Sequence, residues 1–362
     1  MQTKIEEIRC PNCASKNIKK AGIRKGKVQN KQQYFCKECS KVFTLNLEQL
    51  NKTYSLQTIL KAVSLYNLGN SQTEIQALLR TNPKPSQKTI SNWINEFKTT
   101  TTFNRLRNEA KVQFSPDNII DQYEFLHNNL NYRYQIHNFK LKELTGSNEK
   151  LQRLKLYLEK ITTKDFPHHI FKSNPEIKEK SDRASQTNFS ALSIRPLSKQ
   201  NLANKLCQLA LNLAKSNKDR HQAIQDFMLT NDSTTIATEV PIYLTKDDLL
   251  YFLSKGFSIN PQDYSTPVTG HIDILQIRNN LIHILDYKPE AKKQKPIEQL
   301  TIYALALASK TKLVLKDFKC AWFDENNYFE FFPLHVVYKK EFKSISKNYR
   351  KFIKEKSIIN YK

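Results

Sequence analysis

Two apolar, β-branched runs with an Asn-Asn pair between them constrain the fold of this chain more than any other feature. The runs occupy residues 272–277 and 282–285, and the pair occupies 279–280. An Asn-Asn pair between such runs is a turn signal, so we expect an antiparallel hairpin. Because strand side chains alternate between faces, Asp273 in the first run and Asp286 after the second are predicted to face each other across neighbouring strands.

These two carboxylates and a nearby lysine predict a site for a hard divalent cation. Two carboxylates a few ångströms apart repel, and each raises the pKa of the other. Mg²⁺ or Mn²⁺ relieves this repulsion, because such cations bind carboxylates together with waters and substrate phosphate. Lys288 follows two residues after Asp286 and projects to the same side of the strand. Its ammonium could orient an attacking water and neutralise phosphate charge, as phosphodiester hydrolysis requires.

Three short motifs follow one another between residues 270 and 303. They are Gly270-x-x-Asp273, Asp286-x-Lys288 and Gln299-x-x-x-Tyr303. In this order and spacing, the segment from residue 239 to residue 303 resembles the PD-(D/E)XK nuclease superfamily in its RecB-like branch. Each motif alone is ordinary, since strand-end charge pairs, turns and polar helix faces occur in many proteins. The joint order carries the resemblance, which covers about a fifth of the chain.

The resemblance implies a role for each motif residue. Asp273 and Asp286 would bind Mg²⁺ or Mn²⁺, and Lys288 would be the catalytic lysine. Gln299 and Tyr303 lie four residues apart on one face of a predicted helix and would contact the substrate backbone. The family's fold implies an α/β restriction-endonuclease-like core with a mixed central sheet. The alternative is a degenerate domain that keeps this fold without activity.

Two residues upstream extend the candidate site. Glu239 corresponds to the family's upstream acidic residue and is a further candidate catalytic residue and Mg²⁺ or Mn²⁺ ligand. Many relatives also carry an early histidine ligand, and His221 is the one histidine in the helix predicted before Glu239. The alternative interpretation of His221 is an exposed or hydrogen-bonded histidine that binds no metal.

The N-terminal region carries two C-x-x-C pairs separated by 22 residues. Their cysteines are Cys10, Cys13, Cys36 and Cys39. Each pair can supply two thiolates from one tight turn, so the spacing predicts a structural, tetrahedral Zn²⁺ site. A redox C-x-x-C would need a neighbouring βαβ pattern, and disulfides are not expected without a signal peptide. Cys207 and Cys320 stand in apolar contexts and are interpreted as small core residues.

The segment around these cysteines is basic and contains three aromatic residues. Tyr34, Phe35 and Phe43 flank the second pair and are predicted to form a small core rather than a base-stacking surface. The pattern resembles the zinc ribbons at the start of some insertion-sequence transposases.

Three short helices are predicted after the ribbon. Residues 54–68 have apolar residues at helical spacing, Ser71 and Glu74 form a capping box for a second helix, and Ser86 caps a third. The second helix has an apolar face at Ile75, Leu78 and Leu79. This arrangement resembles the tri-helical, helix-turn-helix DNA-binding domains of transposases and resolvases, and a plain helical bundle is the alternative. Candidate base contacts lie near the start of the third helix: Gln87, Lys88, Ser91 and Asn92.

The charge balance favours a polyanionic partner. The chain has 58 Lys and Arg against 34 Asp and Glu, a net charge of +24, and basic surfaces bind polyanions by counterion release. Double-stranded DNA is the expected partner, and a second copy of the chain, in a homodimer, is a further possible partner. No long apolar stretch predicts a membrane span, and no Walker loop or dinucleotide fingerprint predicts a nucleotide cofactor. We expect a cytoplasmic, nucleoid-associated protein.

The expected fold class is multidomain α+β. The predicted parts are a zinc ribbon (1–50), a helix-turn-helix domain (51–100), a helical segment (101–171), a linker (172–198), a nuclease domain (199–338) and a basic tail (339–362). In the middle segment we expect helices at 118–130, 132–144 and 148–161. A further helix is expected at 199–214, at the start of the nuclease domain.

Together these features predict a metal-dependent DNA endonuclease, as suits a mobile element, recombination or defence. Two alternatives stay open: a DNA-binding regulator with an inactive nuclease-like domain, and a RecB-like exonuclease that processes DNA ends. Intact Asp273, Asp286 and Lys288 favour an enzyme. The separate helix-turn-helix domain favours internal duplex sites over ends.

Overall fold

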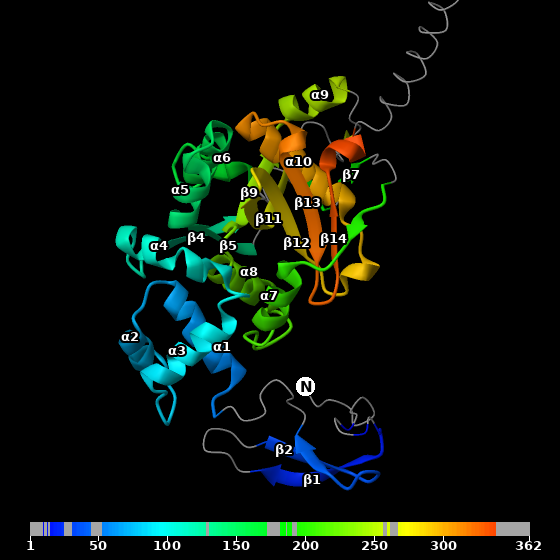
Figure 1. Cartoon of the computed structure of the whole chain (residues 1–362). Coiled ribbons are helices and arrows are strands. Elements are labelled where there is room, and N and C mark those ends of the chain that lie inside the picture. Colours follow the sequence, from blue (N-terminus) through cyan, green and yellow to red (C-terminus); the bar gives the residue numbers. More distant parts are fainter. Residues whose placement is uncertain are drawn as a thin grey trace, which may run out of the picture. The chain divides into compact units, whose positions relative to one another are not determined.

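The computed structural model describes most of the chain (Figure 1). The described residues are 10, 13, 15–24, 31–44, 53–127, 130–171, 182–185, 187–189, 194–255, 259–260 and 267–337. They belong to two compact units, residues 1–99 and 100–362. Much of the predicted linker at 172–198 and all of the predicted tail at 339–362 lie outside the described residues.

The first unit begins with a small antiparallel sheet in the order β1-β2-β3. Its strands are β1 (Ile18–Arg24), β2 (Lys31–Cys36) and β3 (Val42–Thr44). Ile18 and Tyr34 are buried, and Phe43 packs against them with its ring centroid 5.9 Å from that of Tyr34. Tyr34 and Phe43 therefore contribute to a small core, as the sequence predicted, but the prediction is wrong for Phe35. The Phe35 side chain points to the other face of β2 and is half-buried, with Lys19 Nζ 5.2 Å from its ring centroid. A core of this size buries too little apolar surface to hold a fold without further support.

Three helices follow in the same unit: α1 (Leu56–Asn67), α2 (Gln72–Leu78) and α3 (Gln87–Phe97). The capping box of Ser71 and Glu74 and the Ser86 cap form as predicted. Ile75 and Leu79 are buried, but Leu78 is 47% exposed, so its predicted place on the apolar face is wrong. Positions 75 and 79 are one turn apart and share a face, whereas position 78 is rotated away from position 79 by about 100°.

The second unit is built on a large mixed sheet, so the predicted mixed α+β class is confirmed. Its strands are β4 (Ile120–His127), β5 (Leu130–His137), β6 (Asp182–Arg183), β7 (Asn188–Phe189), β8 (Leu197–Ser198), β9 (Thr235–Leu244), β10 (Ile259–Asn260), β11 (Val268–Arg278), β12 (Leu281–Tyr287), β13 (Phe318–Phe323) and β14 (Tyr328–Phe331). Within the described residues, the main sheet has the order β4-β5-β9-β11-β12-β13-β14-β8, and β6 pairs with β11. β7 and β10 form a separate pair.

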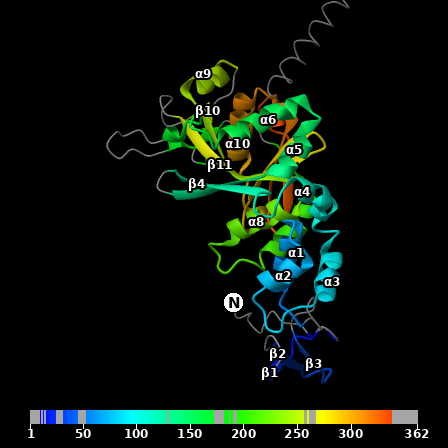
Figure 2. The ribbon, with the colours of Figure 1, turned by 90° about the vertical axis from the view of Figure 1, so that its left-hand side faces the viewer.

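Helices of the second unit connect and cover these strands. They are η3 (Thr102–Arg105), α4 (Arg107–Gln113), α5 (Asn138–Gly146), α6 (Glu149–Lys160), η4 (His168–Phe171), α7 (Leu202–Ala210), α8 (Arg220–Asn231), α9 (Lys246–Ser254), η5 (Ala291–Lys293), α10 (Ile297–Thr311) and η6 (Leu315–Asp317). In Figures 1 and 2, α6, α9 and α10 lie together, and α8 lies apart from them. None of the described helices combines the length and apolar character needed to cross a bilayer.

α10 is the central helix of the core. β12 and β13 are parallel, and parallel neighbours need a crossover connection, which α10 supplies. Ten of its 15 residues are buried. The apolar residues among them share one cluster with α6, β9, β11, β12 and β13. Because α10 is surrounded by protein on most sides, side chains on its first turns have well-defined positions.

The middle of the chain differs from the prediction. The helices expected at 118–130 and 132–144 are wrong, because β4 occupies residues 120–127, β5 occupies residues 130–137, and α5 follows as a helix. β5 pairs with β9, so this region belongs to the main sheet. Alternation of apolar and polar residues and a second Asn-Asn pair, at 128–129, were the signals of a hairpin here. The helix expected at 148–161 is confirmed as α6.

Candidate functional site

Four cysteines in the first unit form the tightest group of possible metal ligands. The sulfur atoms of Cys10 and Cys39 are 3.5 Å apart, as are those of Cys13 and Cys36. Among the described residues, only these four bring three or more possible ligand atoms within 4.8 Å of one another. Such a group could bind a metal ion such as zinc.

Each of the two C-x-x-C pairs is held in a tight turn by backbone hydrogen bonds. The amide of Cys10 donates to the Ser15 carbonyl over 2.8 Å, and the amide of Cys36 donates to the Lys41 carbonyl over 2.9 Å. Ser40 has a φ of 54°, in the left-handed region, directly after the second pair. These contacts accompany an arrangement in which the four sulfur atoms lie within reach of a single ion.

In the second unit, β11 and β12 form the predicted antiparallel hairpin. Ile274 pairs with Leu285, and the same register places Asp273 opposite Asp286. Asn279 and Asn280 both have positive φ, at 50° and 58°, as a tight type I′ turn requires. The prediction that the two carboxylates face each other is confirmed by this register.

Asp286 and Lys288 form a close ion pair at the end of β12. Lys288 Nζ lies 2.8 Å from Asp286 Oδ2 and 3.1 Å from Asp286 Oδ1. Asp286 is only 2% exposed, and burial together with the charge of Asp273 raises its pKa well above the usual value. Burial disfavours the charge on Lys288, but the Asp286 carboxylate outweighs this and raises the lysine pKa. Lys288 therefore keeps its proton at neutral pH.

Asp273 has several hydrogen-bond donors around its carboxylate. Burial would raise its pKa, but hydrogen bonds involving His221 and Asp286 and the nearby Lys288 charge lower it instead. The Tyr287 amide donates to Asp273 Oδ2 over 3.2 Å, and His221 Nδ1 lies 3.6 Å from the same oxygen. The surroundings of Asp273 therefore favour its charged form, whereas those of Asp286 disfavour it.

Glu239 joins this pair from β9 in an unusual backbone conformation. β9 pairs with β11 on both sides of this position, at Val240 with Ile272 and at Thr238 with Ile274. Glu239 itself has a φ of 50°, which a non-glycine residue in the middle of a sheet rarely adopts. Strain of this kind persists where the surrounding structure enforces it, and it is concentrated at functional sites.

The surroundings of the Glu239 carboxylate disfavour its charged form. Burial and the nearby Asp273 charge raise its pKa to about 7. Gln225 on α8 donates to Glu239 Oε1 over 2.6 Å. His221 lies four residues before Gln225 on the same face of α8, so one helix face contacts two of the acidic residues. The structure thus places His221 at the carboxylates, with its side chain 46% exposed.

Arg133 is a further cation near the site that the sequence interpretation missed. Its guanidinium pairs with Asp226 on α8, and the exposed fractions of the two side chains are 25% and 41%. The charge of Arg133 also lowers the pKa of Glu239 slightly, against the larger effect of burial. Residues 132–144 were predicted as a helix in a separate segment. The sequence therefore did not predict that Arg133 lies near Glu239.

The two remaining motifs meet in one packing contact. A Cβ at Gly270 would lie 2.6 Å from the ring atom Cε1 of Tyr303, so only glycine fits there. Gln299 Nε2 donates to the Tyr303 hydroxyl over 2.7 Å. Tyr303 is 5% exposed and lies close enough to the carboxylates for their charges to add to the effect of burial, which raises its pKa. Glycine is therefore needed at position 270 because the Tyr303 ring leaves no room for a Cβ, and not because the chain turns there.

The predicted base-contacting residues of α3 lie mostly at the surface. Gln87, Lys88 and Asn92 are exposed, and Ser91 is half-buried. Gln87 Nε2 donates to the Thr73 hydroxyl over 2.9 Å. The opposite face of α3 is buried in the helical core through Ile90, Trp93 and Ile94.

Comparison with known proteins adds no family to this picture. No protein-family model matches the sequence, and neither the curated proteins nor the solved structures contain a significant match. The geometry and chemistry of the residues themselves are therefore the basis for a function.

Proposed function

We propose that this chain is a divalent-metal-dependent deoxyribonuclease that cleaves DNA at Glu239, Asp273, Asp286 and Lys288. The observation that carries the proposal is the convergence of three acidic side chains from three neighbouring strands beside one lysine. Burying like charges together is unfavourable unless a cation or a proton compensates them. A cation-dependent reaction accounts for this arrangement better than a contribution to stability does.

The donor set fits a hard cation such as Mg²⁺ or Mn²⁺. Asp286 Oδ2 is buried and accepts no hydrogen bond of good geometry from the described residues, although Lys288 Nζ is near it. Asp273, Asp286 and Glu239 would hold the cation, and His221 is a further candidate ligand. A bound divalent cation supplies Lewis acidity and lowers the pKa of a coordinated water.

The protein's own residues would orient and neutralise the reacting groups. Lys288 stays protonated because of Asp286, so it donates hydrogen bonds to the attacking water or to a phosphate oxygen and does not act as a base. Asp273, whose surroundings favour the charged form, can accept a hydrogen bond from the water. Gln225 and His221 hold Glu239 and Asp273 in place from α8.

Arg133 would bind a phosphate next to the scissile one. Its present partner, Asp226, is 41% exposed, and an exposed ion pair of this kind contributes little stability. A DNA phosphate can therefore replace Asp226 on the guanidinium, in the bidentate geometry that arginine favours.

The first unit would direct cleavage to chosen duplex sites. We propose that Zn²⁺ binds Cys10, Cys13, Cys36 and Cys39 as a structural ion. The exposed Gln87, Lys88 and Asn92 would then read base edges from the major groove. Deletion of residues 1–99 is expected to abolish preferred cleavage positions and to leave weak, unspecific cutting. Identical maps of cleavage ends before and after the deletion would instead favour an exonuclease that processes DNA ends.

The experiment that tests the proposal incubates purified protein with supercoiled plasmid, linear duplex and single-stranded DNA. We expect cleavage with Mg²⁺ or Mn²⁺ and none with chelator. Supercoiled plasmid distinguishes an endonuclease, because it has no ends. Intact substrates in every arm, together with specific DNA binding, would contradict the proposal and favour the DNA-binding regulator.

A further inference from the structure

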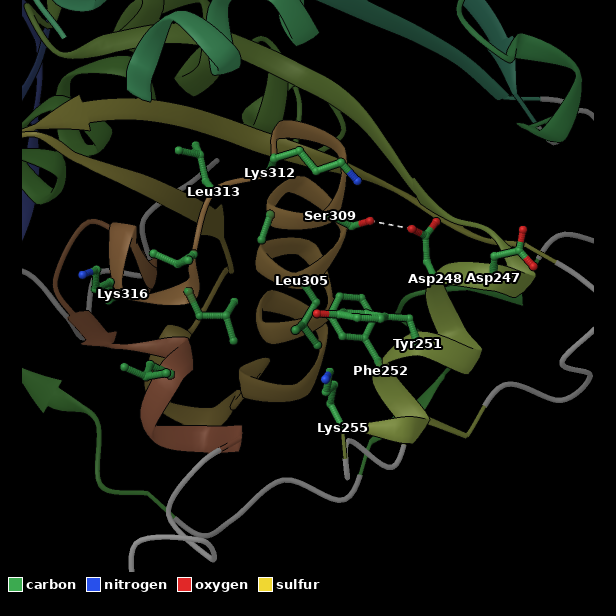
Figure 3. Close-up of a pocket in the computed structure, with 14 residues that line it drawn as sticks. Asp247, Asp248, Tyr251, Phe252, Lys255, Leu305, Ser309, Lys312, Leu313 and Lys316 are labelled. Carbon is green, nitrogen blue, oxygen red and sulfur yellow. Dashed lines mark hydrogen bonds between the residues drawn. The ribbon is translucent and has the colours of Figure 1, made fainter. Parts of the chain in front are cut away.

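A cavity of about 980 Å³ lies between α9 and α10, lined by side chains other than those of the carboxylate site (Figure 3). Its floor is apolar and includes the buried Phe252, Leu305, Leu313 and Leu315. A volume of this size is at the upper end of the range for ligand-binding pockets, which are mostly apolar with a few polar groups at the edge.

Three lysines surround this apolar floor. Figure 3 shows the side chains of Lys255, Lys312 and Lys316 on different sides of it. All three residues are exposed, and within the described part of the chain no carboxylate pairs with their ammonium groups. Lys255 Nζ instead lies 5.6 Å from the ring centroid of Tyr251.

The acidic residues of the cavity do not neutralise these lysines. Asp248 is already paired with Lys310 and accepts a hydrogen bond from Ser309. Asp247 is exposed in the first turn of α9, where the helix dipole favours a negative charge. The rim therefore keeps a net positive charge around an apolar interior.

Apolar side chains at the cavity and on α9 are also exposed. Tyr251 and Val314, which both line the cavity, are 58% and 51% exposed, and Leu250 and Leu253 of α9 are each 44% exposed. Exposed apolar side chains beside a cavity are a feature of protein interaction sites. Three separated cations also favour a ligand with several carboxylates over a ligand with one.

We propose that this cavity binds an acidic peptide segment of a partner protein, with a bulky apolar side chain in the pocket and carboxylates on Lys255, Lys312 and Lys316. Duplex DNA would match the lysines but has no apolar group for the floor. The chain's own residues 339–362 contain nine basic and two acidic residues, so the lysine rim repels them. This inference does not depend on the proposed nuclease activity.

The test measures fluorescence anisotropy of a labelled peptide, Asp-Asp-Phe-Asp-Asp-Phe-Asp, with the full-length protein. We expect saturable binding that is at least tenfold weaker for a peptide with Ser in place of both Phe residues. The same tenfold loss is expected for the double variant Lys312→Glu with Lys316→Glu, and for Ala308→Phe, which fills the cavity. Lys164→Glu is the matched control, because Lys164 is exposed elsewhere in the same unit.

Two outcomes would overturn the proposal. Equal binding of the Phe and Ser peptides would show unspecific attraction of a polyanion to a chain of charge +24. Binding that appears only after deletion of residues 338–362 would show that the chain's own C-terminal segment occupies the cavity. Circular dichroism of each variant confirms that a loss of binding is not a loss of folding.

Discussion

The two groups of candidate metal ligands in this molecule are built in opposite ways. The four cysteines come from two short turns on a sheet with a very small core. The carboxylates come from three strands of a large sheet, and Lys288, His221 and Gln225 contact them. The first group lacks a core that could hold it together, whereas the second is embedded in one.

This difference separates a metal ion that would hold a fold together from one that would act on a substrate. Thiolates around a small core gain stability from the ion, since metal binding and folding are coupled there. The carboxylate site carries buried like charges and a left-handed Glu239, each of which costs stability. A large core tolerates such costs, and they are expected where chemistry takes place.

The largest expected effect is the loss of the ion from the cysteine site. One zinc per chain should co-purify, and Cys36→Ser should remove it and unfold β1–β3, because a structural zinc contributes on the order of 10 kcal/mol to folding. Elemental analysis and limited proteolysis measure this. Cys207→Ala is the control, since Cys207 is buried in the second unit and should leave the zinc in place. Retention of zinc by the Cys36 variant would remove the contrast between the two sites.

At the carboxylate site, the corresponding substitution should abolish activity and leave the fold intact. Asp286→Asn is expected to lower the cleavage rate by at least about 10³-fold, because an amide neither binds the cation well nor keeps Lys288 in place. Its melting temperature should stay close to that of the wild type. Asp165→Asn, an exposed position, is the matched control. Undiminished cleavage by the Asp286 variant would refute the assignment of this site.

A smaller effect is expected from the buried charge of Glu239, which lowers the free energy of unfolding. Its folded-state pKa of about 7 lies above the ordinary value of 4.5, so the folded state holds a proton that the unfolded state loses. Stability should therefore fall as pH rises from about 4.5 to about 7, by at most about 3 kcal/mol. Glu239→Gln removes the charge, so the variant should be more stable than the wild type above pH 7.

Urea unfolding at pH 5 and pH 8 without added divalent cations measures this difference. The chain has two tryptophans, and a Trp93→Phe background leaves Trp322 as the reporter of the second unit. A variant that is no more stable than the wild type at pH 8 would show that Glu239 carries no buried-charge cost.

The smallest expected effect concerns the contact between two motifs of the carboxylate site. Gly270→Ala should lower the free energy of unfolding by about 2 kcal/mol, because the new methyl overlaps the Tyr303 ring. The cost should shrink when Tyr303→Leu is present, which a double-mutant cycle measures. Gly146→Ala is the control, since a Cβ there meets nothing within 4 Å. An equal cost in both backgrounds would mean that Tyr303 is not the cause.

The two hairpins of the main sheet show where sequence interpretation succeeds and fails. Both have an Asn-Asn pair between apolar runs, at 279–280 and at 128–129. The first was predicted correctly because continuous β-branched runs mark buried central strands. The second, β4–β5, has more polar residues and was mistaken for helix, since β4 lies at the sheet edge and half of its residues are exposed. Missing β5 also meant missing Arg133.

The sequence by itself determined the features that depend on neighbouring residues. The cysteine turns, the helix caps at Ser71 and Ser86, and the β11–β12 register all follow from short-range sterics and periodicity. Only the tertiary structure decided the left-handed backbone of Glu239 and the close packing of Tyr303 on Gly270. Both features arise because strands and helices that are distant along the chain share one close-packed core. The conformational preferences of neighbouring residues do not encode such contacts.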